Sequence, residues 1–167
     1  RLLAGHDELE VVCILSTENV GRRIDALYPE LTGFTDLVCQ ESRIDIIKEK
    51  CDAVFLALPH GLSAVMAMEL LPAGIKCVDL GADFRLKDAK LYEKYYDKVH
   101  EAPELLEKAI YGLPELYREK IKNTSLVANP GCFPTGAILP LAPLLAAGVV
   151  QPEGIIIDSK TGVTGAG

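Results

Sequence analysis

The sequence predicts a doubly wound α/β fold with a parallel sheet. Strand-like and helix-like segments alternate along the chain, and glycine or proline separates them. Residues 53–59 form a continuous apolar run, which is typical of a strand buried on both faces of a parallel sheet. Of the 167 residues, 49% are hydrophobic and 25% are charged, which is the composition of a folded protein rather than a disordered one.

The predicted elements follow one another in a regular order. Strands are expected over 10–15, 53–59 and 154–160. A strand with its exit loop is expected over 76–84, and a strand with a tight turn over 125–131. Helices are expected over 41–50, 62–74 and 134–148, and residues 87–122 hold further helix-forming stretches. Pro140 and Pro143 fall inside the last helix. Because proline removes a backbone donor, we expect that helix to kink or break there.

The best domain boundary is the stretch from Gly148 to Gly154, which contains Pro152. Residues 1–148 are therefore predicted to form one domain, and residues 149–167 to begin a second, α+β domain with its first strand. Both ends look cut. The chain opens on what reads as the last turn of a helix and closes on the glycine-rich loop TGVTGAG at 161–167.

Composition argues against several classes of function. The net charge is −7 and lysine and arginine form no cluster, so we expect no nucleic-acid partner. No apolar run approaches the roughly 20 residues of a membrane span. The five cysteines show no C-x-x-C pair, which indicates reduced thiols in a cytoplasmic protein, and no histidine spacing suggests a metal site.

Candidate functional residues gather where the predicted strands end. Doubly wound sheets bind ligands at the carboxyl ends of their strands. Polar or turn-forming residues stand at these positions along the chain: Ser16 and Thr17, Pro59, His60 and Gly61, Arg85, and Asn129 to Cys132.

Cys132 is the strongest catalytic candidate. In NPGCFPT at 129–135 it follows a strand and a turn, and Pro134 is well placed as an early helical residue. Unpaired N–H groups at a helix start favour the reactive thiolate and can hold an oxyanion. Most free cysteines are structural, and we assign that role to Cys13, Cys51 and Cys77.

Five motifs resemble those of the N-acetyl-gamma-glutamyl-phosphate reductase family, which belongs with the aspartate-semialdehyde dehydrogenases. They are ALPHGLS at 57–63, DLGADFRL at 79–86, YGLPELYRE at 111–119, NPGCFPT at 129–135 and DSKTGVTGAG at 158–167. The resemblance implies a Rossmann-like NAD(P)-binding domain over 1–148, and 149–167 as the start of a catalytic and dimerisation domain. It implies an enzyme of arginine biosynthesis, active as a homo-oligomer when full length.

The resemblance also implies roles for single residues. Cys132 attacks the acyl phosphate, and NADPH then reduces the thioester to the semialdehyde. Arg85 and Asn129 are expected to bind the substrate, since a guanidinium grips carboxylate or phosphate with a paired fork. The alternative for Arg85 is a structural role in a surface salt bridge.

Cofactor contacts are expected in three places. Ser16 and Thr17 end the first strand, where small hydroxyls leave room for the 2′-phosphate of NADP, although Glu18 is close. Pro59, His60 and Gly61 are expected near the ribose or pyrophosphate, and Gly162 and Gly165 belong to a loop that reaches the cofactor. His60 is expected to be structural, and His6 and His100 to be solvated.

The family's first strand, its phosphate loop and its catalytic histidine have no counterpart in these residues. We therefore expect a frayed sheet and little or no turnover from the 167-residue chain alone. Two alternatives stay open: a sister reductase acting on aminoadipyl or aspartyl phosphate, and a dinucleotide-binding protein without catalysis.

Overall fold

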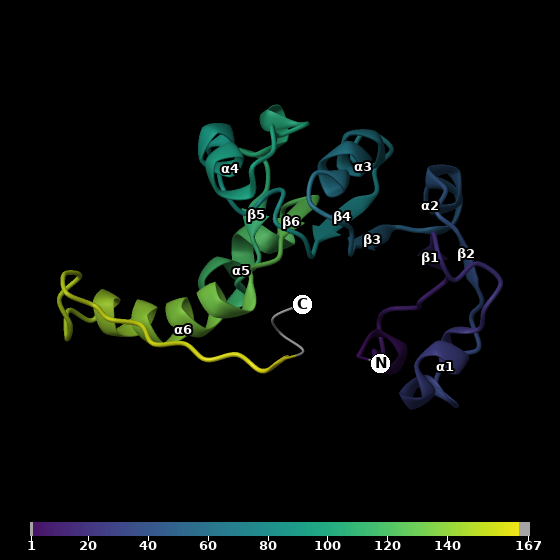
Figure 1. Ribbon diagram of the computed structural model, residues 1–167, viewed down its shortest axis with the longest axis horizontal. Coiled ribbons are helices and arrows are strands. Elements are labelled where there is room, and N and C mark those ends of the chain that lie inside the picture. Colours follow the sequence, from purple (N-terminus) through teal and green to yellow (C-terminus); the bar gives the residue numbers. More distant parts are fainter. Residues whose placement is uncertain (1, 164–167) are drawn as a thin grey trace. The chain divides into compact units, whose positions relative to one another are not determined.

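Parallel strands alternate with helices in the computed structural model, which describes residues 2–163 (Figure 1). This confirms the predicted α/β class. The chain divides into two compact units. Unit 1 comprises residues 1–54 and 66–77, and unit 2 comprises residues 55–65 and 78–167.

Unit 1 holds a two-stranded parallel sheet. β1 (Ile14–Ser16) pairs with β2 (Cys39–Glu41), with Ile14 opposite Cys39 and Ser16 opposite Glu41. A short turn η1 (Leu3–Gly5) precedes β1, and α1 (Ile24–Leu27) and η2 (Pro29–Leu31) lie between the strands. α2 (Ile44–Lys50) follows β2 and buries Ile47. The sequence did not predict β2, because only Cys39 of its three residues is apolar.

The second sheet has four strands in the order β3–β4–β6–β5. Its members are β3 (Ala53–Leu56), β4 (Lys76–Asp79), β5 (Ile110–Tyr111) and β6 (Leu126–Ala128). β5 and β6 run parallel, with Tyr111 opposite Ala128. Two sheets thus form where one was predicted, and no strand among residues 2–163 joins them.

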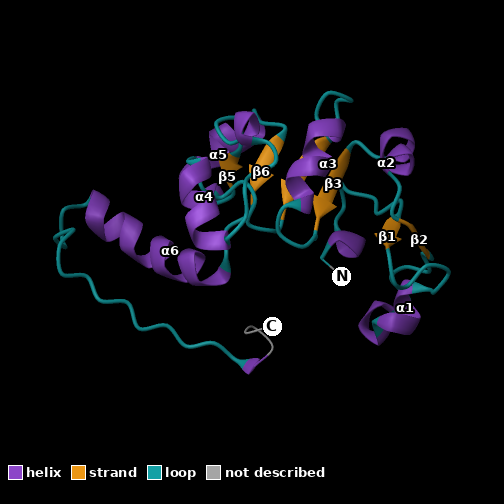
Figure 2. Cartoon of the chain, turned by 45° about the horizontal axis from the view of Figure 1, so that its top comes forward, coloured by secondary structure: helices purple, strands orange, loops and turns teal. Residues whose placement is uncertain are grey.

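Helices follow the strands as the doubly wound pattern predicts. α3 (Leu62–Leu70) follows β3, and the chain turns at Gly74, whose φ of 83° suits glycine. α4 (Ala89–Tyr96), η3 (Pro103–Leu105) and α5 (Pro114–Lys122) occupy the 87–122 region, and Figure 2 shows α4 and α5 beside β5 and β6. The core of unit 2 lies among these elements and is built from Leu56, Ala64, Ala82, Phe84, Tyr92, Leu106 and Leu126.

β3 is less buried than predicted. Its order places it at the edge of the four-stranded sheet, and Phe55 is 46% exposed. Only Leu56 of this strand is buried. The expectation of burial on both faces is therefore wrong for these residues, since Ala53 and Phe55 are exposed.

α6 (Cys132–Ala146) is a single helix of 15 residues. It continues through Pro140 and Pro143 without a break, and the alternative that it kinks there stays a prediction. A helix interior loses one hydrogen bond at each proline, and the bonds around them hold the element together. α6 buries none of its residues, although it is strongly apolar.

The predicted strand at 154–160 is also wrong. These residues form no strand and run back along α6 towards its first residue (Figure 1). Strand structure needs a neighbouring ladder of hydrogen bonds, and no described strand lies beside this segment. Ile156 is consequently 92% exposed. The predicted domain division at residue 148 stays a prediction.

No helix among the described residues has the length and apolar character needed to cross a membrane.

Candidate functional site

Cys132 is the first residue of α6, and Gly131 is the helix N-cap with an extended φ of −69° and ψ of 158°. The thiol is solvent-exposed, as a nucleophile must be. The first N–H groups of a helix lack partners within the helix, and the positive end of its dipole attracts negative charge. The predicted strand–turn–helix setting of Cys132 is therefore what the structure shows.

The residues that precede the thiol form a well-fixed turn, Asn129–Gly131, called here the cysteine turn. The N–H of Asn129 donates to the carbonyl of Asp79 at 2.8 Å. At the other end, the carbonyl of Gly131 accepts from Thr135 twice, from its N–H at 3.0 Å and from its hydroxyl at 2.8 Å. The turn is thus tied to the end of β4 and to the first turn of α6.

Arg85 lies directly against the cysteine turn. Its Nε donates to the carbonyl of Asn129 at 2.8 Å, and its Nη2 donates to the carbonyl of Leu80 at 3.1 Å. A Cβ added to Gly131 would lie 3.2 Å from Nη1, so the guanidinium packs closely on the turn. Arg85 and Asn129, the two predicted substrate binders, therefore lie together, yet two guanidinium nitrogens already hold backbone carbonyls.

The loop that carries Arg85 is residues 79–85, which follow β4. Asp83 in this loop is 1% exposed and uses both carboxylate oxygens. Oδ1 accepts from the N–H of Gly61 at 2.8 Å and from the Tyr92 hydroxyl at 3.0 Å, and Oδ2 accepts from the N–H of Ala64 at 3.0 Å. A single buried carboxylate thereby ties the 79–85 loop to the start of α3.

Asp83 changes the interpretation of the predicted nucleotide contacts at 59–61. The N–H of Gly61 already donates to Asp83, so this donor is used within the protein. Gly61 has a φ of 93°, which only glycine adopts easily, and this conformation directs the turn. The His60 ring lies 5.2 Å from the ring of Tyr96, and its carbonyl accepts from Lys98 at 2.8 Å, which fits the predicted structural role.

His100 is buried, with 5% exposure, and the expectation that it is solvated is wrong. Its Nε2 lies 2.6 Å from the carbonyl oxygen of Asp83, and its Nδ1 accepts from the N–H of Ala102. Its ring also meets Phe84 and Tyr92 edge-on. A lone histidine in a polar stretch gave no signal of this packing.

Burial sets the ionisation of the groups in this region. Burial raises the pKa of Asp79 above its usual range, and the nearby Ser63 hydroxyl and the N–H of Gly81, which donates to Oδ1 at 2.9 Å, oppose this rise. Burial, followed by the hydrogen bond to Asp83, raises the pKa of the Tyr92 hydroxyl. Tyr92 therefore stays neutral and donates to the carboxylate over the whole physiological range.

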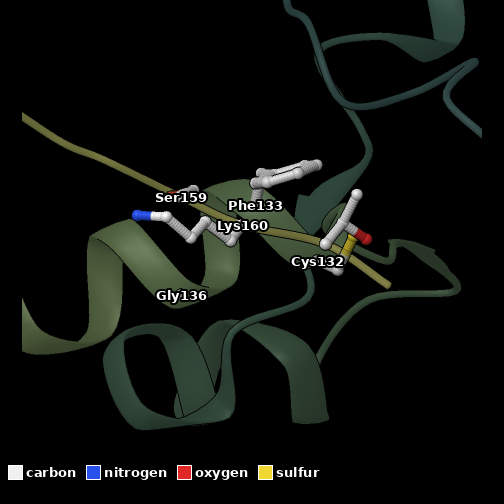
Figure 3. Close-up of a pocket in the computed structure, with 6 residues that line it drawn as sticks. Cys132, Phe133, Gly136, Ser159 and Lys160 are labelled. Carbon is white, nitrogen blue, oxygen red and sulfur yellow. The ribbon is translucent and has the colours of Figure 1, made fainter. Parts of the chain in front are cut away.

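A pocket of about 250 Å³ opens beside the thiol. Cys132, Phe133 and Gly136 from α6 line one side, and Ser159, Lys160 and Thr161 line the other (Figure 3). The ammonium group of Lys160 points away from Cys132 and pairs with Asp158 at 2.7 Å. Gly162 is exposed and follows this segment, whereas Gly165 lies outside the described residues.

The turn after β1, residues 16–22, holds the other predicted cofactor residues. The Ser16 hydroxyl accepts from the N–H groups of Glu18 and Asn19, which closes the turn and leaves Thr17 exposed. Sequence reasoning missed Arg22, whose Nη1 donates to Asn19 Oδ1 at 3.3 Å. A basic residue within six positions of a strand end is the signal that would have found it.

The structural cysteines divide into two kinds. Cys39 and Cys77 are buried, as predicted for Cys77. Cys13 and Cys51 are half-buried, with their sulfur atoms 3.6 Å apart. Burial and the neighbouring Cys13 thiol raise the pKa of Cys51 to about 11.

Comparison with known proteins shows the family and the fold. Residues 1–124 match the model of the semialdehyde dehydrogenase NAD binding domain, and residues 132–167 match that of the semialdehyde dehydrogenase dimerisation domain. A crystal structure of aspartate semialdehyde dehydrogenase with NADP from Candida albicans is similar, with a TM-score of 0.59 and 18% identity. The match covers 87% of this chain and 42% of that one. The likeness shows the fold.

Curated relatives share the predicted name. N-acetyl-gamma-glutamyl-phosphate reductases of Symbiobacterium thermophilum, Heliobacterium modesticaldum and Acinetobacter baylyi are 53%, 51% and 48% identical to the chain. Each match covers 100% of this chain and 48% of the relative, so the chain spans about half their length. The resemblance inferred from the five motifs is confirmed. The chain belongs to the semialdehyde dehydrogenase family, whose NAD binding domain it matches over residues 1–124.

Proposed function

We propose that this chain is the nucleotide-binding and nucleophile-bearing part of an N-acetyl-gamma-glutamyl-phosphate reductase. The reaction is the NADPH-dependent reduction of N-acetyl-gamma-glutamyl phosphate to N-acetylglutamate 5-semialdehyde with release of phosphate, a step of arginine biosynthesis. The observation that carries the proposal is the exposed thiol of Cys132 at the first residue of α6, on a fixed turn. The names of relatives at 48–53% identity support it.

The chemistry uses Cys132 twice. Its sulfur forms a bond to the acyl carbon while the bond from that carbon to the phosphate oxygen breaks, which gives a thioester and inorganic phosphate. NADPH, when bound, supplies the hydride that reduces this thioester. The carbon–sulfur bond then breaks, so that the aldehyde leaves and the thiolate is restored. The N–H groups at the start of α6 are placed to hold the negative oxygen that develops in both steps.

The 16–22 turn suits the adenosine end of NADP. Ser16 and Thr17 place two small hydroxyl side chains at the end of a parallel strand, and Arg22 adds a positive charge to the same turn. An arginine nearby is what a 2′-phosphate needs in such folds. Pro59, His60, Gly61 and Gly162 stay proposed cofactor contacts. At Gly61 the contact must involve groups other than its N–H, which Asp83 already binds.

Arg85 and Asn129 are proposed to meet the substrate beside the thiol. The Arg85 nitrogen Nη1, which lies 3.2 Å from the position of a Cβ added to Gly131, is not used in the two backbone hydrogen bonds of this guanidinium. A guanidinium at this place can contact the phosphate or carboxylate of the substrate. The full-length enzyme is further proposed to be a cytoplasmic homo-oligomer, an expectation that the match of 132–167 to a dimerisation domain supports.

The test uses the full reading frame, assayed in the reverse direction with phosphate and NADP⁺. N-acetylglutamate semialdehyde and aspartate semialdehyde are offered side by side. Preference for the acetylated substrate, abolished in Cys132→Ala, is the expected result. Preference for aspartate semialdehyde would assign the chain to a sister reductase. Binding of NADP⁺ without turnover of either would contradict the proposed reaction.

A further inference from the structure

We propose that Arg85 is a positioning residue for the nucleophile, which fixes the cysteine turn before any substrate is bound. The inference rests on the proposed function, because it takes Cys132 as the attacking group. It differs from a substrate-binding role in one respect. A binding residue acts only when substrate is present, whereas a positioning residue changes the thiol in the free enzyme.

Arg85 donates hydrogen bonds to two backbone carbonyls, and its guanidinium forms a bridge between them. Nε donates to the carbonyl of Asn129, three residues before the thiol, and Nη2 donates to the carbonyl of Leu80. These two carbonyls belong to segments 49 residues apart in the sequence, the 79–85 loop and the cysteine turn. One planar guanidinium with two parallel donors can hold both at a set separation.

The loop that carries Arg85 is held by several hydrogen bonds, so the guanidinium can fix the position of the cysteine turn. Two residues earlier in the same loop, Asp83 is held by three donors from Gly61, Ala64 and Tyr92. The N–H of Arg85 donates to the carbonyl of Ala82 at 3.3 Å. A half-buried arginine on a loop fixed in this way has few alternative positions to adopt.

Arg85 completes a set of restraints on the cysteine turn. The N–H of Asn129 is bound by Asp79 and the carbonyl of Gly131 by Thr135, which leaves the carbonyl of Asn129 for the guanidinium. Without Arg85 this half-buried carbonyl loses a charge-assisted donor, and the turn can rotate about its peptide units. The Cys132 sulfur would then no longer be held in one position at the start of α6, where the first N–H groups have no partner within the helix.

Lysine cannot replace this bridge. It keeps the positive charge but carries its donors on a single nitrogen at the end of a flexible stem, so it cannot present two parallel donors at a fixed separation. Arg85→Lys therefore separates charge from geometry. Arg85→Met keeps most of the side-chain volume and removes all donors. Arg118→Lys, at an exposed position of α5, is the matched control.

The experiment measures the rate at which iodoacetamide alkylates Cys132 in the full-length enzyme without substrate or nucleotide. Peptide mapping by mass spectrometry assigns the label, and thermal melting confirms that each variant is folded. We expect alkylation to slow about tenfold in Arg85→Lys and at least as much in Arg85→Met, since each loses a hydrogen bond from a charged donor. Arg118→Lys should match the wild type.

Unchanged alkylation in a folded Arg85→Lys or Arg85→Met enzyme, with only the KM for substrate raised, would overturn the inference and leave Arg85 as a binding residue. If one variant fails to melt cooperatively, the other decides. Cys132→Ala is assayed in the same series. Reductase activity retained in Cys132→Ala would contradict the proposed function itself. Loss of that activity, together with unchanged alkylation of Cys132 in the Arg85 variants, would reject only the positioning role.

Discussion

At the scale of single residues, buried hydrogen bonds decide where the functional side chains lie. Cys132 was predicted from its neighbours in sequence, because NPGC followed by a proline marks a turn and a helix start. Asp83 and His100 were not predicted as structural centres. The carboxylate of Asp83 and the Nε2 of His100 have partners 9 to 22 residues away, and no local pattern reports such contacts.

Replacing Asp83 by alanine should strongly destabilise the fold. The change leaves the N–H groups of Gly61 and Ala64 and the hydroxyl of Tyr92 without their acceptor. We expect the free energy of unfolding to fall by about 3 kcal/mol, as for other buried charged partners. Urea denaturation of the 167-residue chain measures this. Asp36→Ala, at an exposed position, should change stability by less than about 0.5 kcal/mol, and an equal loss in both variants would contradict the account.

Cys51 should resist alkylation at a pH where Cys132 reacts. Its pKa is raised from 9.0 to about 11 by burial and by Cys13, so little thiolate forms below pH 9. Because the folded pKa is the higher one, the protonated thiol stabilises the fold below pH 9, and this contribution is lost as the pH rises towards 11. Iodoacetamide labelling at pH 8 should mark Cys132 first. Equal rates at the two sites would contradict the assignment.

The pH dependence of stability gives a second measurement of the same shift. The difference in urea midpoint between the wild type and Cys51→Ala should be constant below pH 9 and move against the wild type between pH 9 and pH 11. A difference that does not change with pH would show that the thiol titrates alike in the folded and unfolded chain.

At the scale of elements, the sequence predicted most strands and helices, but several predicted elements are longer than the observed ones. The strand expected over 53–59 is β3 at Ala53–Leu56, whereas the strand and exit loop expected over 76–84 are β4 at Lys76–Asp79 and the loop that follows it. Apolar runs continue past the last ladder bond into the loops that carry the functional residues. β5 has only two residues, which is too short for a periodic pattern of hydrophobic residues. Residues 154–160 are apolar-rich but form no strand.

Two glycines allow a matched test of the packing that supports the cysteine turn. A Cβ on Gly112 would lie 3.0 Å from Val127 Cγ1 and 3.2 Å from the carbonyl oxygen of Ala128, whereas a Cβ on Gly136 would meet nothing within 4 Å. Gly112→Ala should therefore lower the free energy of unfolding by about 1–3 kcal/mol. Gly136→Ala, inside α6, should raise it by about 0.5–1 kcal/mol. Urea denaturation compares the two, and the same sign for both would contradict the packing described.

At the scale of the whole molecule, the chain holds the proposed nucleophile and spans 48% of the length of its curated relatives. The family resemblance predicts that the catalytic base comes from a histidine motif that residues 1–167 do not contain. The sequence could not predict that the apolar side of α6 is exposed or that the segment after it pairs with no strand. Both features depend on tertiary packing. Local patterns report which segments can form elements and cannot report what covers them.

We expect the 167-residue chain alone to show no reductase turnover with NADPH and acyl phosphate, while Cys132 still alkylates. A thiol on a folded turn needs only its own helix for nucleophilicity, whereas turnover needs a proton donor and a complete nucleotide site. A spectrophotometric assay of NADPH oxidation, with the full-length enzyme as control, tests this. Turnover by the short chain at a rate near that of the full-length enzyme would contradict it.

The central claim is that Cys132 takes the acyl group from the acyl phosphate. The most direct measurement mixes the full-length enzyme with N-acetyl-gamma-glutamyl phosphate in the absence of NADPH and locates the adduct by peptide mass spectrometry. The account predicts one acyl group on the peptide that contains Cys132, release of one phosphate per active site, and no adduct in Cys132→Ala. An adduct on another residue, or reduction of the substrate by the Cys132→Ala enzyme, would contradict it.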